Sequence, residues 1–139
     1  AFNTEAQPIL SGTAGKWLEV ADAPQLKAAT EALRDRLPSG GTNLHGAFDA
    51  VGTLPGGPDN IFLITDGLPT QSYEPPRRTT ISGRDRLNLF RKAVQRLPSG
   101  VPVNIILAPM EGDPMAASEF WQLAQVSGGS FMSPSRDWP

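Results

Sequence analysis

Apolar residues recur along the chain at two spacings. In four segments they return every three or four positions, the period of an amphipathic helix, and short continuous apolar runs typical of strands lie between them. The predicted helices span 24–37, 43–54, 84–97 and 114–127, and the predicted strands span 60–65, 101–107 and 130–132. Because helices and strands alternate, the pattern predicts an α/β fold with a mostly parallel sheet.

Each predicted helix has an apolar stripe and a marked end. Asp22 is a candidate N-cap with Pro24 in the first turn behind it, and a proline or glycine follows every helix. The stripes are Leu26, Ala29, Leu33 and Leu37; Leu44, Ala47, Phe48 and Val51; Leu87, Phe90, Val94 and Leu97; and Ala117, Phe120, Trp121 and Ala124. The second and fourth stripes are expected to be buried.

The strands and tryptophans complete the predicted core. The runs 60–65 and 101–107 are almost wholly apolar, which predicts strands buried on both faces of a parallel sheet. Residues 17–20 are a candidate edge strand, and Trp17 and Trp121 are expected to lie in the core.

Composition narrows the function classes. The 139 residues suit one domain spanning 1–139. With 12 basic and 14 acidic residues the formal charge is −2, which provides no attraction for nucleic acid. The absence of cysteine excludes disulfides, thiolate metal sites and cysteine catalysis and leaves the compartment open. The sequence contains no apolar stretch of the roughly 20 residues that a membrane-spanning segment needs.

Two segments can bring polar groups to the carboxyl ends of the strands, where open α/β sheets bind ligands. Asp66 follows the most apolar strand, and Gly67 would allow a close approach to a ligand; an ordinary strand-to-turn junction is the alternative. Gly41, Thr42 and Asn43 open a helix, either as an N-cap or as an anion cradle or a hydroxyl ligand of a hard cation. The Gly-Lys-Ser/Thr of a phosphate-binding loop is absent.

The order of these segments resembles the von Willebrand factor type A family. The matching series is Gly-Gly-Thr-Asn-Leu at 40–44, Asn-Ile-Phe-Leu-Ile-Thr-Asp-Gly at 60–67, Val-Pro-Val-Asn-Ile-Ile at 101–106 and Leu-Ala-Gln-Val-Ser-Gly-Gly-Ser-Phe at 123–131. The resemblance covers nearly the whole chain, from the family's second strand to its last. It implies a three-layer, Rossmann-like fold with helices on both faces of the sheet.

The resemblance also implies a metal-ion-dependent adhesion site. Thr42 and Asp66 match two of the family's metal ligands, whereas its Asp-x-Ser-x-Ser motif is absent. Mg²⁺, or Mn²⁺ or Ca²⁺ in its place, favours oxygen ligands, and an ion with few anionic ligands can accept a carboxylate from a partner protein. Asp66 supplies a single negative charge and a helix N-terminus disfavours cations, so metal binding by these residues alone is predicted to be weak or absent. Gly41, Asn43 and Gly67 would shape the binding loops.

The first strand and helix of the resembling family have no match in this sequence. In the family that strand is central, between the second and the fourth, and its loss would leave backbone groups unpaired inside a buried sheet. We therefore expect the two elements upstream in the parent protein or on another chain. A structure in which Phe2 pairs with the strand 60–65 would contradict this expectation.

The predicted function is that of a protein-binding module, not an enzyme. The resemblance implies cation-assisted recognition of an acidic residue on a partner protein, as in cell adhesion. Two alternatives stay open, a metal-independent scaffold for protein assembly and an accessory subunit of a metal-chelatase-type ATPase complex.

His45 and the loop 67–83 are the remaining candidate contact residues. His45, the only histidine, is expected to face solvent near Thr42, and no Ser or Cys partner at a recognisable spacing supports a catalytic triad. A polar, proline-rich loop of this length often carries function, with disorder as the alternative. Its candidate recognition residues are Tyr73, Glu74, Arg77 and Arg78.

Overall fold

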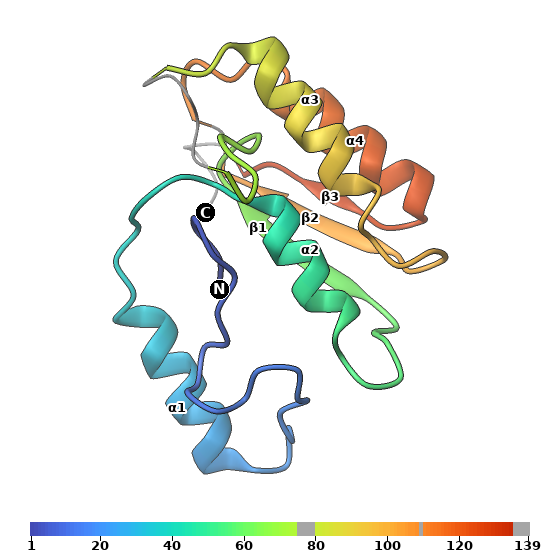
Figure 1. The fold of residues 1–139 in the computed structure, drawn as a ribbon. Coiled ribbons are helices and arrows are strands. Elements are labelled where there is room, and N and C mark those ends of the chain that lie inside the picture. Colours follow the sequence, from blue (N-terminus) through green and yellow to red (C-terminus); the bar gives the residue numbers. More distant parts are fainter. Residues whose placement is uncertain (75–79, 109, 135–139) are drawn as a thin grey trace.

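The computed structural model describes residues 1–74, 80–108 and 110–134. Within this part of the chain, four helices and three strands follow one another in the predicted order (Figure 1). They are α1 (Ala23–Arg34), α2 (Leu44–Gly52), β1 (Ile61–Thr65), α3 (Gly83–Val94), β2 (Val103–Leu107), α4 (Ala116–Ser127) and β3 (Phe131–Met132). The α/β class is therefore confirmed, and these seven elements differ from their predicted counterparts only at their ends.

The segment 17–20 forms no strand, so that prediction is wrong. Its groups bind a turn and helix α1 instead of a neighbouring strand. The indole N–H of Trp17 donates to the carbonyl of Pro55 (2.9 Å), and the backbone N–H of Glu19 donates to the side chain of Gln25 (3.1 Å). Trp17 is 55% exposed, which also contradicts its expected place in the core.

The sheet is parallel, as the alternation of helices and strands predicted. Its order in the described residues is β1-β2-β3. Ile61 lies opposite Val103, Thr65 lies opposite Leu107, and the short β3 pairs with the second half of β2. All three carboxyl ends therefore lie at one edge of the sheet, and the loops that leave them, with the candidate residue Asp66, begin there.

Local capping residues set where the helices begin and end. The side chain of Asp22 accepts from the N–H of Gln25 at the start of α1, as predicted, and Asn43 accepts from the N–H of Gly46 at the start of α2. Helix α4 ends at Gly128, whose φ of 76° lies in the left-handed region that favours glycine.

The core lies on one face of the sheet, against α2, α3 and α4. The inward strand residues are Ile61, Leu63, Val103, Ile105 and Leu107, and the helices contribute Leu44, Phe48, Phe90, Ala93, Ala116, Phe120, Leu123 and Ala124. The rings of Phe90 and Phe120 meet edge to face, with their centroids 5.0 Å apart. This contact joins α3 to α4 above the middle strand.

The opposite face of the sheet is uncovered in the described residues, which corrects the prediction of strands buried on both faces. Phe62 is 72% exposed and Ile64 is 66% exposed. The register brings Ile106 beside Ile64, and Met132 follows on β3. We call these four side chains the bare face. Phe62, Ile64 and Met132 are exposed and Ile106 is half-buried, because α2, α3 and α4 all pack on the other side. The prediction of helices on both faces is therefore not met by this part of the chain.

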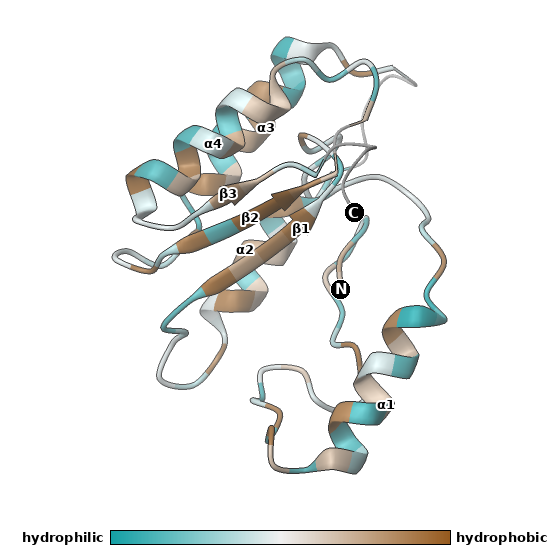
Figure 2. Ribbon diagram, turned by 180° about the vertical axis from the view of Figure 1, so that it is seen from behind, coloured by the Kyte–Doolittle hydropathy of each residue, from teal (hydrophilic) through white to brown (hydrophobic). Residues whose placement is uncertain are grey.

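Helix α1 stands apart from the sheet in both views (Figures 1 and 2). Only Ala29 of its apolar stripe is buried, whereas Leu26, Leu33 and the following Leu37 are exposed. The amphipathic pattern therefore predicted the helix, but the described residues do not cover its apolar stripe as is usual for such a helix.

The inward stripe of α4 differs from the predicted one. Phe120 and Ala124 are buried as expected, but Ala117 is exposed and Trp121 is 55% exposed. Leu123 takes the buried position instead. A stripe that includes 116, 120, 123 and 124 follows the helical period, and this register turns residues 117 and 121 to the outer side.

Candidate functional site

Asp66 lies at the carboxyl end of β1 with its side chain exposed. The hydroxyl of the preceding Thr65 donates to the carbonyl of Gly67 (3.2 Å), which closes a tight turn. A Cβ at Gly67 would lie 2.7 Å from Oδ2 of Asp113 and 3.0 Å from Nη2 of Arg86. Glycine is thus required here by close packing inside the protein, rather than by an approach to a ligand.

The glycine turn before α2 packs directly against the loop that follows Asp66. The N–H of Thr42 donates to Oγ1 of Thr70 (2.9 Å), and its carbonyl accepts from the N–H groups of Thr70 (3.0 Å) and Gln71 (3.3 Å). A Cβ at Gly41 would lie 2.8 Å from side-chain oxygens of both residues. The fold therefore brings together the two segments that contain Thr42 and Asp66.

Asn43 acts as the N-cap of α2, which confirms the structural alternative for this residue. Its side-chain oxygen accepts from the N–H of Gly46 (3.1 Å), and its side-chain amide donates to the carbonyl of Thr4 (3.0 Å). Its backbone N–H donates to the carbonyl of Asn3 (2.8 Å). Asn43 thus attaches the N-terminal segment to the site, with a side chain already engaged in protein contacts.

His45 is buried, so the expectation that it faces solvent is wrong. Only 6% of the residue is exposed, and its Nδ1 has no hydrogen-bond partner among the described residues. The ring lies edge-on to Tyr73, with centroids 6.3 Å apart. Burial is the main cause that lowers the pKa of His45, and the nearby charge of Arg96 lowers it further.

A polar cluster surrounds this histidine. Asp49, one turn further along α2, accepts a hydrogen bond from the hydroxyl of Tyr73 and forms an ion pair with Arg96 (3.4 Å). The bond to Asp49 raises the pKa of Tyr73. The cluster joins α2, the end of α3 and the loop after β1. Arg77 and Arg78 of the predicted recognition loop lie outside the described residues.

A buried ion pair that the sequence reasoning missed lies beneath the same loop. Nη2 of Arg86 on α3 is 2.8 Å from Oδ2 of Asp113, and their side chains are 12% and 2% exposed. The same carboxylate oxygen accepts from the N–H of Leu68 (2.7 Å), and Arg86 donates to the carbonyl of Leu68. No spacing pattern links these two residues, because they meet only through the fold.

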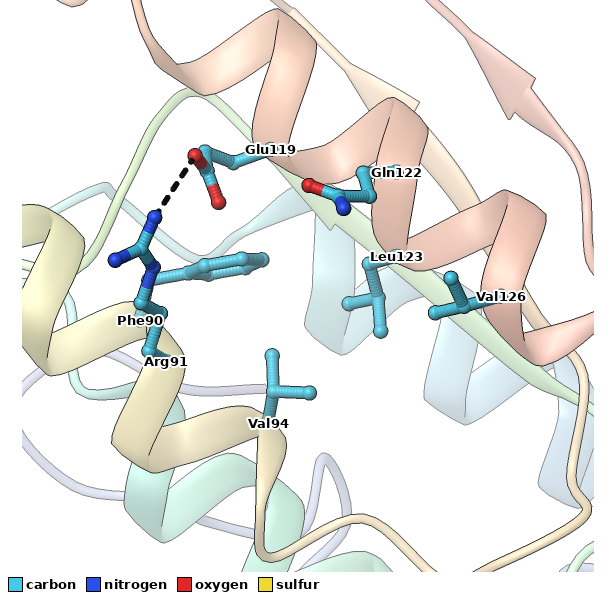
Figure 3. Close-up of a pocket in the computed structure, with 7 residues that line it drawn as sticks. All are labelled: Phe90, Arg91, Val94, Glu119, Gln122, Leu123 and Val126. Atoms are coloured by element: carbon cyan, nitrogen blue, oxygen red, sulfur yellow. Dashed lines mark ion pairs between the residues drawn. The ribbon is translucent and has the colours of Figure 1, made fainter.

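A separate groove of about 280 Å³ lies between α3 and α4 (Figure 3). Its apolar lining comes from Phe90, Val94, Leu123 and Val126. The ion pair between Arg91 and Glu119 (3.8 Å) lies at one end, as the dashed line shows. None of the site residues expected from the sequence lines this groove.

The groups available to a metal at the sheet edge are oxygens. The Thr42 hydroxyl and the Asp66 carboxylate are ligand types that Mg²⁺ accepts, but they contribute one negative charge in total. The described residues contain no group of three or more His, Asp or Glu side chains arranged to hold a metal ion. This donor set fits at most a weakly held cation.

Comparisons with models of known protein families, with curated proteins and with solved structures gave no match. In the described residues, every helix is too short or too polar to span a lipid bilayer.

The pKa of His45 leads to a prediction about pH. A lowered pKa means that the unfolded chain binds more protons than the folded one, so stability is present above the ordinary pKa of about 6.5 and is lost as the pH falls through the lowered value. Urea unfolding at about pH 7.5 and about pH 5.5 should therefore give a smaller free energy at the lower pH. His45→Gln should flatten this difference; an unchanged slope in the variant would show that other groups cause it.

Proposed function

We propose that this chain is part of a von Willebrand factor type A-like domain that recognises an acidic group on a partner protein with the help of a divalent cation. The cation would be held between the Thr42 hydroxyl and the Asp66 carboxylate. The observation that carries the proposal is the set of hydrogen bonds between the backbone of Thr42 and the residues Thr70 and Gln71, which join the glycine turn to the loop after Asp66. A cation held there would lie beyond the carboxyl ends of the strands, where open α/β sheets bind ligands.

The free edge of β1 supports the fold part of the proposal. Ile61 donates to Pro102 and Thr65 accepts from Ala108, so both direct their backbone groups toward β2. Alternation then directs the backbone groups of Phe62 and Ile64 to the other edge, where the described residues provide no strand. The resemblance assigns the family's first strand to this position.

The N-terminal segment does not fill that edge. Phe2 forms an isolated antiparallel bridge with Ala6 rather than with β1. Pairing of Phe2 with the strand 60–65, which would have contradicted the expected first strand, is therefore not observed. A strand supplied from the parent protein or from another chain would pair with Phe62 and Ile64, and its helix would cover the bare face.

The metal site can be tested with Mn²⁺, which broadens the NMR signals of nearby nuclei. At about millimolar concentration, the expected range for a weak site with few anionic ligands, Mn²⁺ should broaden the amide signals of Thr42 and Asp66 together. Asp66→Asn should remove the broadening at both positions. The matched control is Asp59→Asn, because Asp59 is also exposed and precedes the same strand.

Two outcomes would contradict the proposal. Broadening of the Asp66 signal without broadening of the Thr42 signal would show that the two groups do not share an ion. Binding at micromolar Mn²⁺ would contradict a weak site formed by these two ligands alone. Acetate, as the simplest carboxylate, should bind only when Mg²⁺ is present. Equal acetate binding without Mg²⁺ would remove the role of the cation in recognition.

A metal-independent scaffold is the second candidate. The bare face favours it, since a group of exposed apolar side chains at neighbouring sheet positions is typical of a surface that contacts another protein. Phe62 and Met132 are its most widely separated members. In this case Asp66→Asn would leave partner binding intact, whereas Phe62→Ser would weaken it.

A further inference from the structure

We propose that His45, Asp49, Tyr73 and Arg96 form an acid-sensitive latch that holds the loop 66–74 against α2. Near neutral pH the latch is closed, and charging of His45 releases Tyr73. This inference does not depend on a metal at Thr42 and Asp66. It concerns the position of the loop itself, whatever that loop binds.

The closed state depends on contacts at both ends of the loop. Leu68 is held by Asp113 and Arg86, and Thr70 is held by Thr42. Tyr73 lies near the end of the described part of the loop. It is attached to α2 by the hydrogen bond that its hydroxyl donates to Asp49. Of these attachments, the one at Tyr73 is the most exposed, with the tyrosine 60% accessible to solvent.

His45 is the group whose charge would open the latch. The residue is more than nine-tenths buried and its ring lies edge-on to Tyr73, and among the described residues Nδ1 has no hydrogen-bond partner. A buried imidazole without an acceptor disfavours the charged form. The charged groups that face it are Arg96 and Lys92 from α3 and its C-terminal end, which oppose protonation, and Asp49 from α2, which favours it.

Protonation changes the competition for Asp49. Asp49 lies four residues after His45, so the two side chains are neighbours on the surface of the helix. An imidazolium donates from both ring nitrogens, and Asp49, whose charge favours the protonated form, is the carboxylate that Tyr73 binds. Once His45 is charged, it competes with the tyrosine hydroxyl for this acceptor and needs access to water. Both effects displace Tyr73 from its position beside the imidazole ring.

The sequence makes the latch directly observable. The chain contains one histidine and one tyrosine, so each gives a single set of ring signals in an NMR titration. Between about pH 7.5 and about pH 5, above the range where most carboxylates titrate, the His45 signals should move with a midpoint below about 6.5. The Tyr73 ring signals should move with the same midpoint, toward those of a solvated tyrosine.

Two variants separate the latch from general effects of pH. In His45→Gln the Tyr73 signals should stay constant over this range. In Tyr73→Ala, which removes the ring beside the imidazole and frees the carboxylate of Asp49, the His45 midpoint should rise toward about 6.5. The methyl signals of Leu63 and Ile105 in the core should remain unchanged in the parent protein throughout.

Three results would overturn the proposal. The first is a Tyr73 signal that is flat while His45 titrates, and the second is a Tyr73 shift that persists in His45→Gln. The third is simultaneous loss of the core methyl signals, because this would show unfolding of the whole domain instead of local release. The Mn²⁺ experiment at Asp66 can succeed or fail independently of all three.

Discussion

Replacing Asp113 by alanine is expected to lower the free energy of unfolding by about 3–5 kcal/mol. The change would leave the guanidinium of Arg86 largely buried without its carboxylate, and would remove the acceptor of the Leu68 N–H. A folded domain of this size has about 5–15 kcal/mol in total. The variant should therefore be partly unfolded at room temperature or unfold at much lower urea concentration, as followed by circular dichroism.

A control and a rescue make this test specific. Asp59→Ala removes an exposed carboxylate and should change the unfolding free energy by no more than about 0.5 kcal/mol. Combining Asp113→Ala with Arg86→Met removes the uncompensated charge and should restore part of the loss. If Asp113→Ala matched Asp59→Ala in stability, the ion pair would have no structural role under the loop.

The second large loss of stability is expected when Phe120 is replaced by alanine. Its ring is fully buried in the core and contacts Phe90, so Phe120→Ala should lower the unfolding free energy by about 3–5 kcal/mol. The loss combines the transfer of the ring to water with the cavity that remains between α3 and α4. Urea unfolding followed by circular dichroism measures it.

The neighbouring Trp121 is the matched control. It is also aromatic and on the same helix, but it is 55% exposed. Trp121→Ala should therefore lower the unfolding free energy by less than about 1 kcal/mol, near the range for surface substitutions. Equal losses in the two variants would mean that α4 is rotated relative to the packing described above.

The elements themselves could be predicted because their signals are local. Asp22 caps the start of α1 and Gly128 caps the end of α4 through contacts within a few residues, and such contacts act in the same way in any fold. The uninterrupted apolar run of β1 and its position between helices were enough to predict a parallel strand. The predicted contacts of single side chains were less successful. Trp121 and Phe62 were expected inside and are exposed.

The candidate site was predictable only in part. Thr42 and Asp66 came from motif order, and the structure joins the segments that contain them through Thr70. His45 was predicted to face solvent, because the sequence contains no sign that its ring would contact Tyr73. That contact joins residues 28 positions apart, 73 minus 45, so only the path of the loop could reveal it.

Hydrophobic periodicity and capping were enough to predict the alternation of helices and strands, since both act over a few neighbouring residues. Tertiary structure decided which faces are covered. The same continuous apolar run in β1 is buried at Leu63 and exposed at Ile64, because the helices lie on one side only in the described residues. It also decided that Arg86 and Asp113 form a buried pair, since long-range electrostatic contacts depend on how distant elements pack and leave no periodic trace in the chain.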